Sequence, residues 1–205
     1  GGDNYSLDYG WPEPFLALDR YLARRGVPVV LWGASVGPFD AAPPRARRTM
    51  FRHLAGLRAI FLRESASLDY LRGQGLANVF AMADPAFAMP AREPARERLG
   101  FALPPEPIGL NLSPLLARFA AGGDRGRWLG LCAALAERLL AKSGGRSLLL
   151  VPHVTGGGDA GDDFRLLQDL AARLPACRDR IRCLPPTLSA AETKGVIARC
   201  AVFAG

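Results

Sequence analysis

The chain has 205 residues, of which 49% are apolar and 22% charged, the ordinary balance of a globular protein with one large domain or two small ones. The net charge is +7 and 24 of the 26 basic residues are Arg, with 13 basic against 10 acidic residues before residue 100 and 13 against 9 after it. This even spread argues against a nucleic-acid-binding stripe and suits an anionic small substrate or a peripheral role near anionic lipid. No apolar run is long enough to span a membrane, and no secretory signal is visible.

The chain begins with GGDNYS, a polar stretch with two glycines. A Gly-Gly-Asp-Asn run is typical of the tight loop that follows a strand, where ligand-binding groups emerge. We therefore expect residues 1–6 to form a loop at the end of a strand that precedes residue 1. The last residues, 201–205, read as a strand with its first loop glycine.

Short apolar runs alternate with longer helical patterns along the chain. The run VPVVLWG at 27–33 is continuous and ends in glycine, which is typical of a strand buried on both faces. Similar runs predict six further strands, at 58–64, 78–84, 107–113, 147–153, 180–186 and 201–205.

Between these runs, apolar residues recur with the spacing of amphipathic helices, beginning with residues 12–25. Ser65 or Ser67 is expected to cap the N-terminus of one helix, and Ser189 with Glu192 has the spacing of a capping box. The remaining helices are expected at 44–56, 65–74, 126–142, 160–174 and 189–200.

Regular alternation of strands and helices predicts an α/β fold with mostly parallel sheets. The alternation breaks once, at 89–107, a stretch with five prolines and mixed charge. We expect two Rossmann-like lobes, an N-terminal one at 1–90 and a C-terminal one at 107–205, with 91–106 as a linker.

Polar residues that follow the strands are the candidate site residues of the first lobe, since ligands of doubly wound sheets bind at the carboxyl ends of the strands. Asp3 and Asn4 follow two glycines, with an Asx-turn or a helix cap as the alternative role. Ser35 lies in a glycine-bracketed segment that lacks the dinucleotide-binding fingerprint. The Arg63 guanidinium suits a carboxylate or phosphate, with an ion pair to Glu64 as the alternative.

The second lobe offers a similar set. His153 ends a predicted strand, and an imidazole titrates near neutrality, which suits proton transfer; the alternative is a hydrogen bond to a neighbouring carbonyl. Asn111 and Ser113 follow another strand and are expected to face ligand. An acidic, glycine-rich loop precedes the helix at 160–174. Its carboxylates are expected to cap and charge the N-terminus of that helix, with contact of Asp162 or Asp163 to a sugar as the alternative: Asp159, Asp162 and Asp163.

The cysteines Cys132, Cys177, Cys183 and Cys200 form no Cys-x-x-Cys pair. They are interpreted as small buried hydrophobic residues in a reducing compartment. With only two histidines available as well, the sequence predicts no metal site.

Taken in order, eight segments resemble the polysaccharide pyruvyl transferase family over essentially the whole chain: GGDN, LWGASVGP, IFLRESAS, ADPAF, IGLNLSP, LLVPH, DD with a following Leu, and LSAAETKGVIARCAVFAG. The resemblance implies a two-lobed fold similar to GT-B glycosyltransferases. It also implies transfer of the enolpyruvyl unit of phosphoenolpyruvate onto a sugar diol, which gives a pyruvate ketal and phosphate.

By this resemblance, phosphoenolpyruvate is the donor, no cofactor is needed, and the acceptor is a glycan or lipid-linked saccharide of a bacterial polysaccharide. The protein is expected in the cytoplasm, with the inner face of the membrane as the alternative location, and no nucleic acid is expected as a partner. The family has a strand before the GGDN region and an Arg-x-His motif after the final strand, so the chain is expected to be a central fragment.

The ketal chemistry that the resemblance implies needs an acid, a base and substrate-binding groups, and the resemblance also places a His at position 153. His153 and Asp3 are the expected catalytic acid and base, and the expected substrate-binding residues are Asn4, Ser35, Arg63, Asn111 and Ser113. Two alternatives stay open: a GT-B glycosyltransferase that uses a nucleotide sugar, and a non-catalytic relative that serves as an assembly subunit.

Overall fold

The structure is a computed structural model, and it describes residues 2–8, 10–156, 158 and 161–205. The chain divides into two units, Gly1–Met89 (unit 1) and Pro90–Gly205 (unit 2). Over these described residues each unit contains one parallel sheet of four strands with helices between the strands, so the predicted α/β fold with parallel sheets is confirmed. Among the described residues, no helix has the combined length and apolar character that crossing a bilayer requires.

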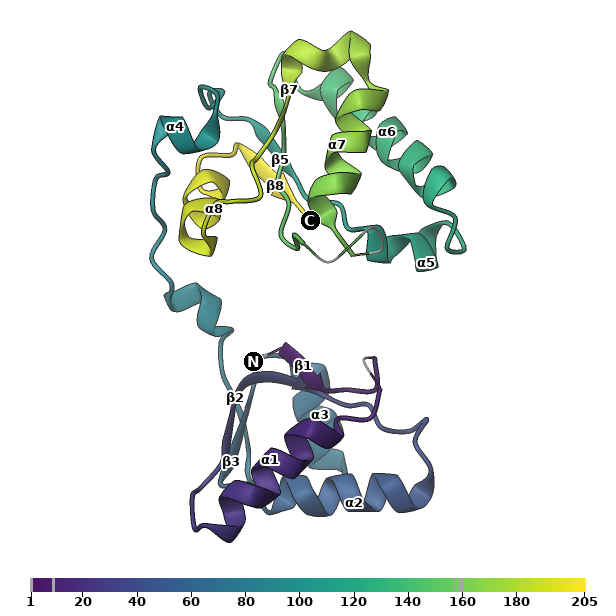
Figure 1. Ribbon diagram of the computed structural model, residues 1–205, viewed down its shortest axis with the longest axis vertical. Coiled ribbons are helices and arrows are strands. Elements are labelled where there is room, and N and C mark those ends of the chain that lie inside the picture. Colours follow the sequence, from purple (N-terminus) through teal and green to yellow (C-terminus); the bar gives the residue numbers. More distant parts are fainter. Residues whose placement is uncertain (1, 9, 157, 159–160) are drawn as a thin grey trace. The chain divides into compact units, whose positions relative to one another are not determined.

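Unit 1 contains a sheet whose strands follow one another in the order β1-β2-β3-β4. Figure 1 labels its first three strands and the helices α1, α2 and α3. Its elements are β1 (Gly2–Tyr5), α1 (Glu13–Arg24), β2 (Val30–Val36), α2 (Pro44–Ala55), β3 (Ala59–Leu62), α3 (Ser65–Gly73), β4 (Val79–Ala81) and the 3-10 helix η1 (Pro85–Ala88). Because right-handed crossovers between consecutive neighbours all run the same way, they place α1, α2 and α3 on one face of the sheet.

The core of unit 1 lies between that face and the three helices. Leu16, Leu54 and Leu71 come from α1, α2 and α3, and they pack with Ile60 and other strand residues in one buried cluster. The opposite face of the sheet carries a row of aromatic rings instead. Trp32, Phe61 and Phe80 come from three adjacent strands with ring centroids 5.1 and 5.4 Å apart, and Trp32 is 56% exposed.

Two predictions about the strands of unit 1 are wrong. The GGDN segment is not a loop, since Gly2–Tyr5 pairs in parallel with the last residues of β2. Gly33 does not end its strand, because it takes a φ of +61° at an irregularity in the register and β2 continues to Val36, so that Ser35 lies within a strand. A glycine supplies such a backbone bend at no steric cost, and sequence pattern alone does not distinguish it from a strand end.

Unit 2 has the strand order β7-β6-β5-β8, which matches the first four strands of the Rossmann order 3-2-1-4-5-6. Its elements are α4 (Arg96–Leu99), β5 (Ile108–Leu110), η2 (Pro114–Leu116), α5 (Ala117–Ala120), α6 (Arg125–Lys142), β6 (Leu148–Leu150), α7 (Asp163–Arg173), η3 (Pro175–Arg180), β7 (Ile181–Cys183), α8 (Ala190–Ile197) and β8 (Val202–Ala204). The chain moves outward from β5 to β7 and then returns to the other side of β5.

Both faces of this second sheet are buried. Leu148 and Leu150 point into one cluster with residues of α6 and α7, whereas Leu149 and Val151 point into a second cluster with Val196 of α8. A strand buried on both faces reads as a continuous apolar run, which is why β6 was recognisable in the sequence.

The stretch at 91–106, expected as a linker, runs along unit 2. The Arg92 N–H donates to the Ala191 carbonyl oxygen at 2.9 Å, and a Cβ added to Gly195 would stand 2.0 Å from the Arg92 oxygen. Leu99 of α4 is buried in the same cluster as Val196. Close backbone packing of this segment against α8 therefore depends on a glycine at 195.

Of the predicted caps of α8 and α3, the first is confirmed and the second is wrong. The capping box is present, since Glu192 N–H donates to the Ser189 side chain and the Glu192 carboxylate accepts from Ser189 N–H. Neither Ser65 nor Ser67 caps α3. The Ser67 hydroxyl instead accepts the Val36 N–H at 3.0 Å, so it joins α3 to the end of β2.

Candidate active-site residues at two sheet edges

Arg63 forms the centre of the polar cluster at the carboxyl edge of the unit 1 sheet. It follows β3 directly, and its guanidinium donates to Asp84 Oδ2 at 2.9 Å and to Asp3 Oδ1 at 3.1 Å. Its Nε donates to the Ser35 hydroxyl at 3.1 Å and lies 3.5 Å from Glu64 Oε1. The parallel sheet brings residues from β1, β2, β3 and the end of β4 to this one edge. We call these five residues the Arg63 cluster.

Three carboxylates surround this one guanidinium, so the Arg63 cluster has an excess of negative charge. The hydrogen bond to Asp84 is the largest of the effects that raise the pKa of Arg63. The N–H of Ala86, followed by the Arg63 guanidinium, lowers the pKa of Asp84. Asp84 also accepts from Ala86 N–H at 2.8 Å and thereby shapes the turn into η1.

The Arg63 cluster is better suited to hydroxyl groups than to anions. Arg63 already donates to two carboxylates and a hydroxyl, while the Ser35 hydroxyl donates to Glu64 at 2.7 Å. Carboxylate oxygens keep free acceptor capacity in such a network and bind the O–H groups of a sugar. Arg63 is 27% exposed on its side chain, so the cluster is accessible at the surface of unit 1. Asn4, the neighbour of Asp3 in β1, is exposed.

A second polar cluster lies at the carboxyl edge of the unit 2 sheet, around Asp163. This carboxylate is only 1% exposed, and its Oδ2 accepts from three donors at 3.1 Å: the N–H groups of His153 and Val154 and the Asn111 side-chain amide. Its Oδ1 is buried and has no hydrogen-bond partner among the residues that the structure describes. The bonds to Asp163 fix the backbone of the loop that carries His153. We call this the Asp163 cluster.

The His153 side chain is exposed at this edge, and its ring stacks on Phe203 of β8 with centroids 5.9 Å apart. The backbone of His153 is held by Asp163, so the imidazole is presented from a fixed position. This arrangement is compatible with proton transfer to or from a ligand at the edge of unit 2.

The other two residues of unit 2 that were expected to bind substrate make hydrogen bonds within the protein. The Asn111 amide donates to Val151 O at 2.9 Å as well as to Asp163, and the Ser113 hydroxyl accepts from Leu115 N–H at 3.3 Å as the cap of η2. Asp162 caps α7, and the N–H of Gly156 is the main cause of its lowered pKa. Asp159 lies outside the described residues.

The Asp163 cluster was only partly foreseen from the sequence. Asp162 caps α7 and Asp163 lies in its first turn, as expected, but the sequence did not indicate that Asp163 is also the buried acceptor of the loop. Two adjacent aspartates before an amphipathic helix give no sequence signal that separates the two roles.

A third set of polar residues joins α1 and α2 of unit 1, and sequence analysis missed it. The buried Asp19 accepts a hydrogen bond from the Tyr5 hydroxyl and lies 3.0 Å from His53 Nε2. Burial, and then the bond to Asp19, raises the pKa of Tyr5. A carboxylate at an inward position of an amphipathic helix is the signal that could have indicated this buried network.

No group of three or more His, Cys, Asp or Glu side chains could hold a metal ion in the part of the chain that the structure describes. All four cysteines are unpaired thiols of unit 2. Burial raises the pKa of Cys132 to about 11 and that of Cys183 to about 12, and it also raises the pKa of Cys200. These three thiols are therefore protonated and unreactive near neutral pH.

Comparison with known proteins gives one family. A family model described as polysaccharide pyruvyl transferase matches residues 1–205. No curated protein matches the chain. Among solved structures, a UDP-forming α,α-trehalose-phosphate synthase from Burkholderia xenovorans is similar with a TM-score of 0.47 and 19% identity, over 92% of this chain and 50% of that chain.

Proposed function

Since this chain belongs to the polysaccharide pyruvyl transferase family, we propose that it takes part in transfer of the enolpyruvyl group of phosphoenolpyruvate to a sugar diol. The family implies a saccharide acceptor. The product would be a pyruvate ketal on a bacterial polysaccharide or its precursor, and the donor is a substrate, so the reaction needs no cofactor. The observation that carries the proposal is the Arg63 cluster, whose accessible carboxylates suit a diol.

The reaction has definite chemical requirements. The methylene carbon of phosphoenolpyruvate gains a proton, which leaves an oxocarbenium-like carbon, and one sugar hydroxyl attacks that carbon with loss of its own proton. The second hydroxyl then adds in the same way as phosphate leaves with the electron pair of its C–O bond. The site must therefore supply a general acid, a general base and groups that orient a diol.

Asp3 is the proposed base and diol-orienting group. Its carboxylate is 39% exposed on its side chain and is held by Arg63 at 3.1 Å. Ser35 and Glu64 extend the same hydrogen-bonding surface, and Asn4 in the same strand is a further proposed contact to the acceptor. In this assignment Arg63 is a positioning residue for Asp3.

His153 is the proposed general acid, since its imidazole is exposed while its backbone is anchored by Asp163. A His that is protonated when substrate binds delivers a proton to carbon and accepts one again from solvent. In this proposal Asn111 helps to hold the His153 loop in place by its hydrogen bond to Asp163. Ser113 positions the neighbouring turn, whose first N–H groups it caps.

The test is an assay of the protein with phosphoenolpyruvate and a panel of glycan acceptors, which measures acceptor-dependent phosphate release and the mass of the ketal product. Asp3→Asn and His153→Gln should each lower kcat by about 10²–10⁴-fold. Asp69→Asn is the matched control, because Asp69 lies exposed on α3 of the same unit, and it should leave kcat unchanged. Absence of phosphate release with every acceptor, together with tight binding of UDP or GDP in calorimetry, would contradict the proposal.

A further inference from the structure

The positive charge of unit 1 is concentrated on one side, although the whole chain has an even charge distribution. Residues 13–58, which contain α1 and α2, carry eight arginines and three acidic residues. Each of these acids already has a partner, in the pairs Glu13–Arg20, Asp19–His53 and Asp40–Arg47. The rest of unit 1 has the opposite balance, two arginines against five acidic residues.

The outer face of α2 is a stripe of arginines. Arg45, Arg48 and Arg52 are spaced i, i+3 and i+7 and are exposed, whereas Met50 and Leu54 of the same helix are fully buried. Their guanidinium groups have no ion pair with any residue that the structure describes in this chain.

The outer face of α1 is apolar and aromatic, with arginine beside it. Leu18 is 54% and Tyr21 51% exposed, while Leu16 and Asp19 face inward. The guanidinium of Arg25 lies over the Tyr21 ring, 4.8 Å from its centroid. Exposed aromatic and aliphatic side chains next to arginine are the composition of helices that lie in a membrane interface.

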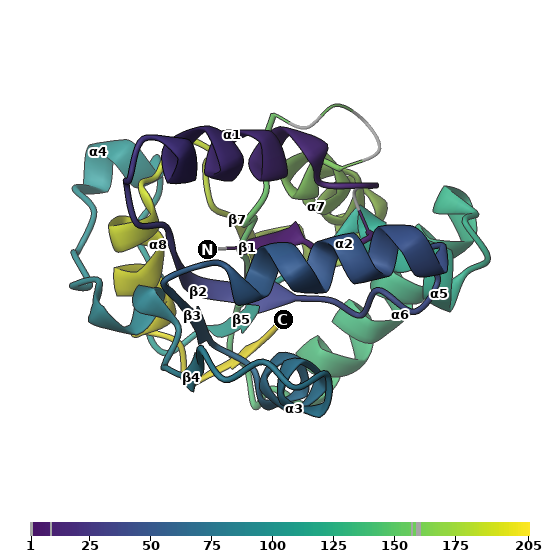
Figure 2. The same ribbon diagram turned by 90° about the horizontal axis from the view of Figure 1, so that it is seen from below.

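The two helices present these outer faces together. Both cover the same face of the sheet, and the Asp19–His53 pair joins them at 3.0 Å. Figure 2 shows both helices lengthwise. We call their combined outer surface, formed by Leu18, Tyr21, Arg25, Arg45, Arg48 and Arg52, the α1–α2 face.

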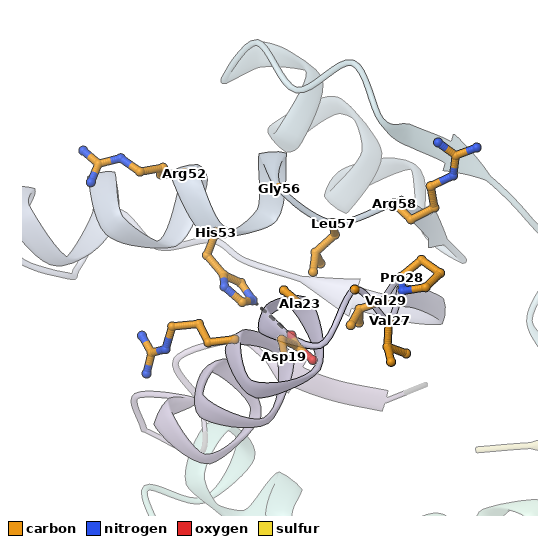
Figure 3. Close-up of a pocket in the computed structure, with 12 residues that line it drawn as sticks. Asp19, Ala23, Val27, Pro28, Val29, Arg52, His53, Gly56, Leu57 and Arg58 are labelled. Atoms are coloured by element: carbon orange, nitrogen blue, oxygen red, sulfur yellow. Dashed lines mark hydrogen bonds and ion pairs between the residues drawn. The ribbon is translucent and has the colours of Figure 1, made fainter.

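A cavity of about 450 Å³ opens between the C-terminal ends of α1 and α2. Its walls include apolar residues such as Val27 and Leu57, and its rim carries Arg20, Arg52 and Arg58. Figure 3 shows the Arg52 and Arg58 side chains extending away from the cavity in different directions. Guanidinium groups that point in different directions cannot bind one small anion together, but they can each contact an extended negatively charged surface.

We propose that the α1–α2 face binds the surface of an anionic lipid bilayer. Charge complementarity supplies the attraction, because each basic residue near an anionic membrane adds to binding. Leu18 and Tyr21 supply the apolar contact that a nucleic-acid backbone would not use. The proposal is independent of the proposed transferase reaction, since it involves none of the residues of the Arg63 cluster.

The test is co-sedimentation of the whole chain with vesicles of phosphatidylcholine alone and of phosphatidylcholine with about one third phosphatidylglycerol. Binding is expected only to the anionic vesicles and should weaken when the ionic strength rises from about 0.1 M to about 1 M, where the screening length is roughly 3 Å. The R45Q/R48Q/R52Q variant should bind about 100-fold more weakly, at about fivefold for each arginine. L18S/Y21S should weaken binding without changing its salt dependence.

The matched control is R127Q/R138Q/R173Q, which removes the same charge from exposed positions of unit 2 and should bind like the parent chain. Circular dichroism checks that each variant remains folded. Equal binding to both vesicles, absence of binding to the anionic ones, or an equal loss in the control would overturn the proposal. Retention of duplex DNA or inorganic phosphate without any vesicle binding would overturn it as well, in favour of a soluble anion.

Discussion

The carboxyl edges of the two sheets stabilise their charged groups in different ways. In unit 1, one guanidinium is surrounded by three carboxylates that are partly exposed. In unit 2, one buried carboxylate is surrounded by neutral N–H donors. Solvent screens the first arrangement and makes it adaptable, whereas the second has no solvent to replace a lost partner. We therefore expect loss of the Asp163 carboxylate to cost more folding stability than loss of the Arg63 guanidinium.

The largest effect should come from Asp163→Ala. Three donors would lose a buried charged acceptor, at about 1–3 kcal/mol for each unsatisfied group, so the free energy of unfolding should fall by about 3 kcal/mol or more. Urea unfolding and hydrogen exchange of peptides around His153 would measure the loss. Asp163→Asn keeps one acceptor oxygen and should cost less.

The control for this prediction is Asp169→Ala on the same helix. Asp169 is exposed and pairs with Arg125 at 2.7 Å, so its removal should cost at most about 1 kcal/mol. Equal losses for Asp163 and Asp169 would show that the contrast between buried and exposed carboxylates does not hold here.

A smaller, salt-dependent effect is expected for Arg63→Ala. Three carboxylates would remain without their cation, which should destabilise unit 1 by about 1–2 kcal/mol at low ionic strength and by less in high salt. Hydrogen exchange of unit 1 peptides at two salt concentrations would measure this. Arg63→Lys restores the charge and should recover part of the loss. The loss in Asp163→Ala should not depend on salt.

The smallest effect concerns acid pH. The pKa of Asp84 and that of Asp162 are lowered in the folded chain, so both carboxylates stabilise it above their ordinary pKa of 3.8. This stability is lost as the pH falls below 3.8 through the lowered folded pKa. Carboxyl ¹³C titration in Arg63→Ala should show a higher midpoint for Asp84 and an unchanged one for Asp162, since backbone N–H groups hold the latter.

Within the described residues the structure has eight strands, and seven of them could be predicted because their apolar residues form continuous runs. The sequence did not predict β1, whose glycine and polar residues have low strand propensity and pair only because β2 lies beside them. In the Arg63 cluster, the hydrogen bond from Arg63 to Asp3 joins residues 60 positions apart, and only the sheet topology brings them together. The opposite roles of Asp162 and Asp163 depend on loop geometry, which residue type does not encode.

The distribution of the cysteines makes the two units distinguishable by chemistry. All four thiols belong to unit 2, and burial keeps Cys132, Cys183 and Cys200 protonated and slow to react. Cys132 alone among the four is buried, so a thiol reagent can modify it only when the surrounding structure opens, and its alkylation rate reports that opening equilibrium. Thiol alkylation of the unmodified sequence therefore measures local opening in unit 2 alone, because unit 1 contains no cysteine.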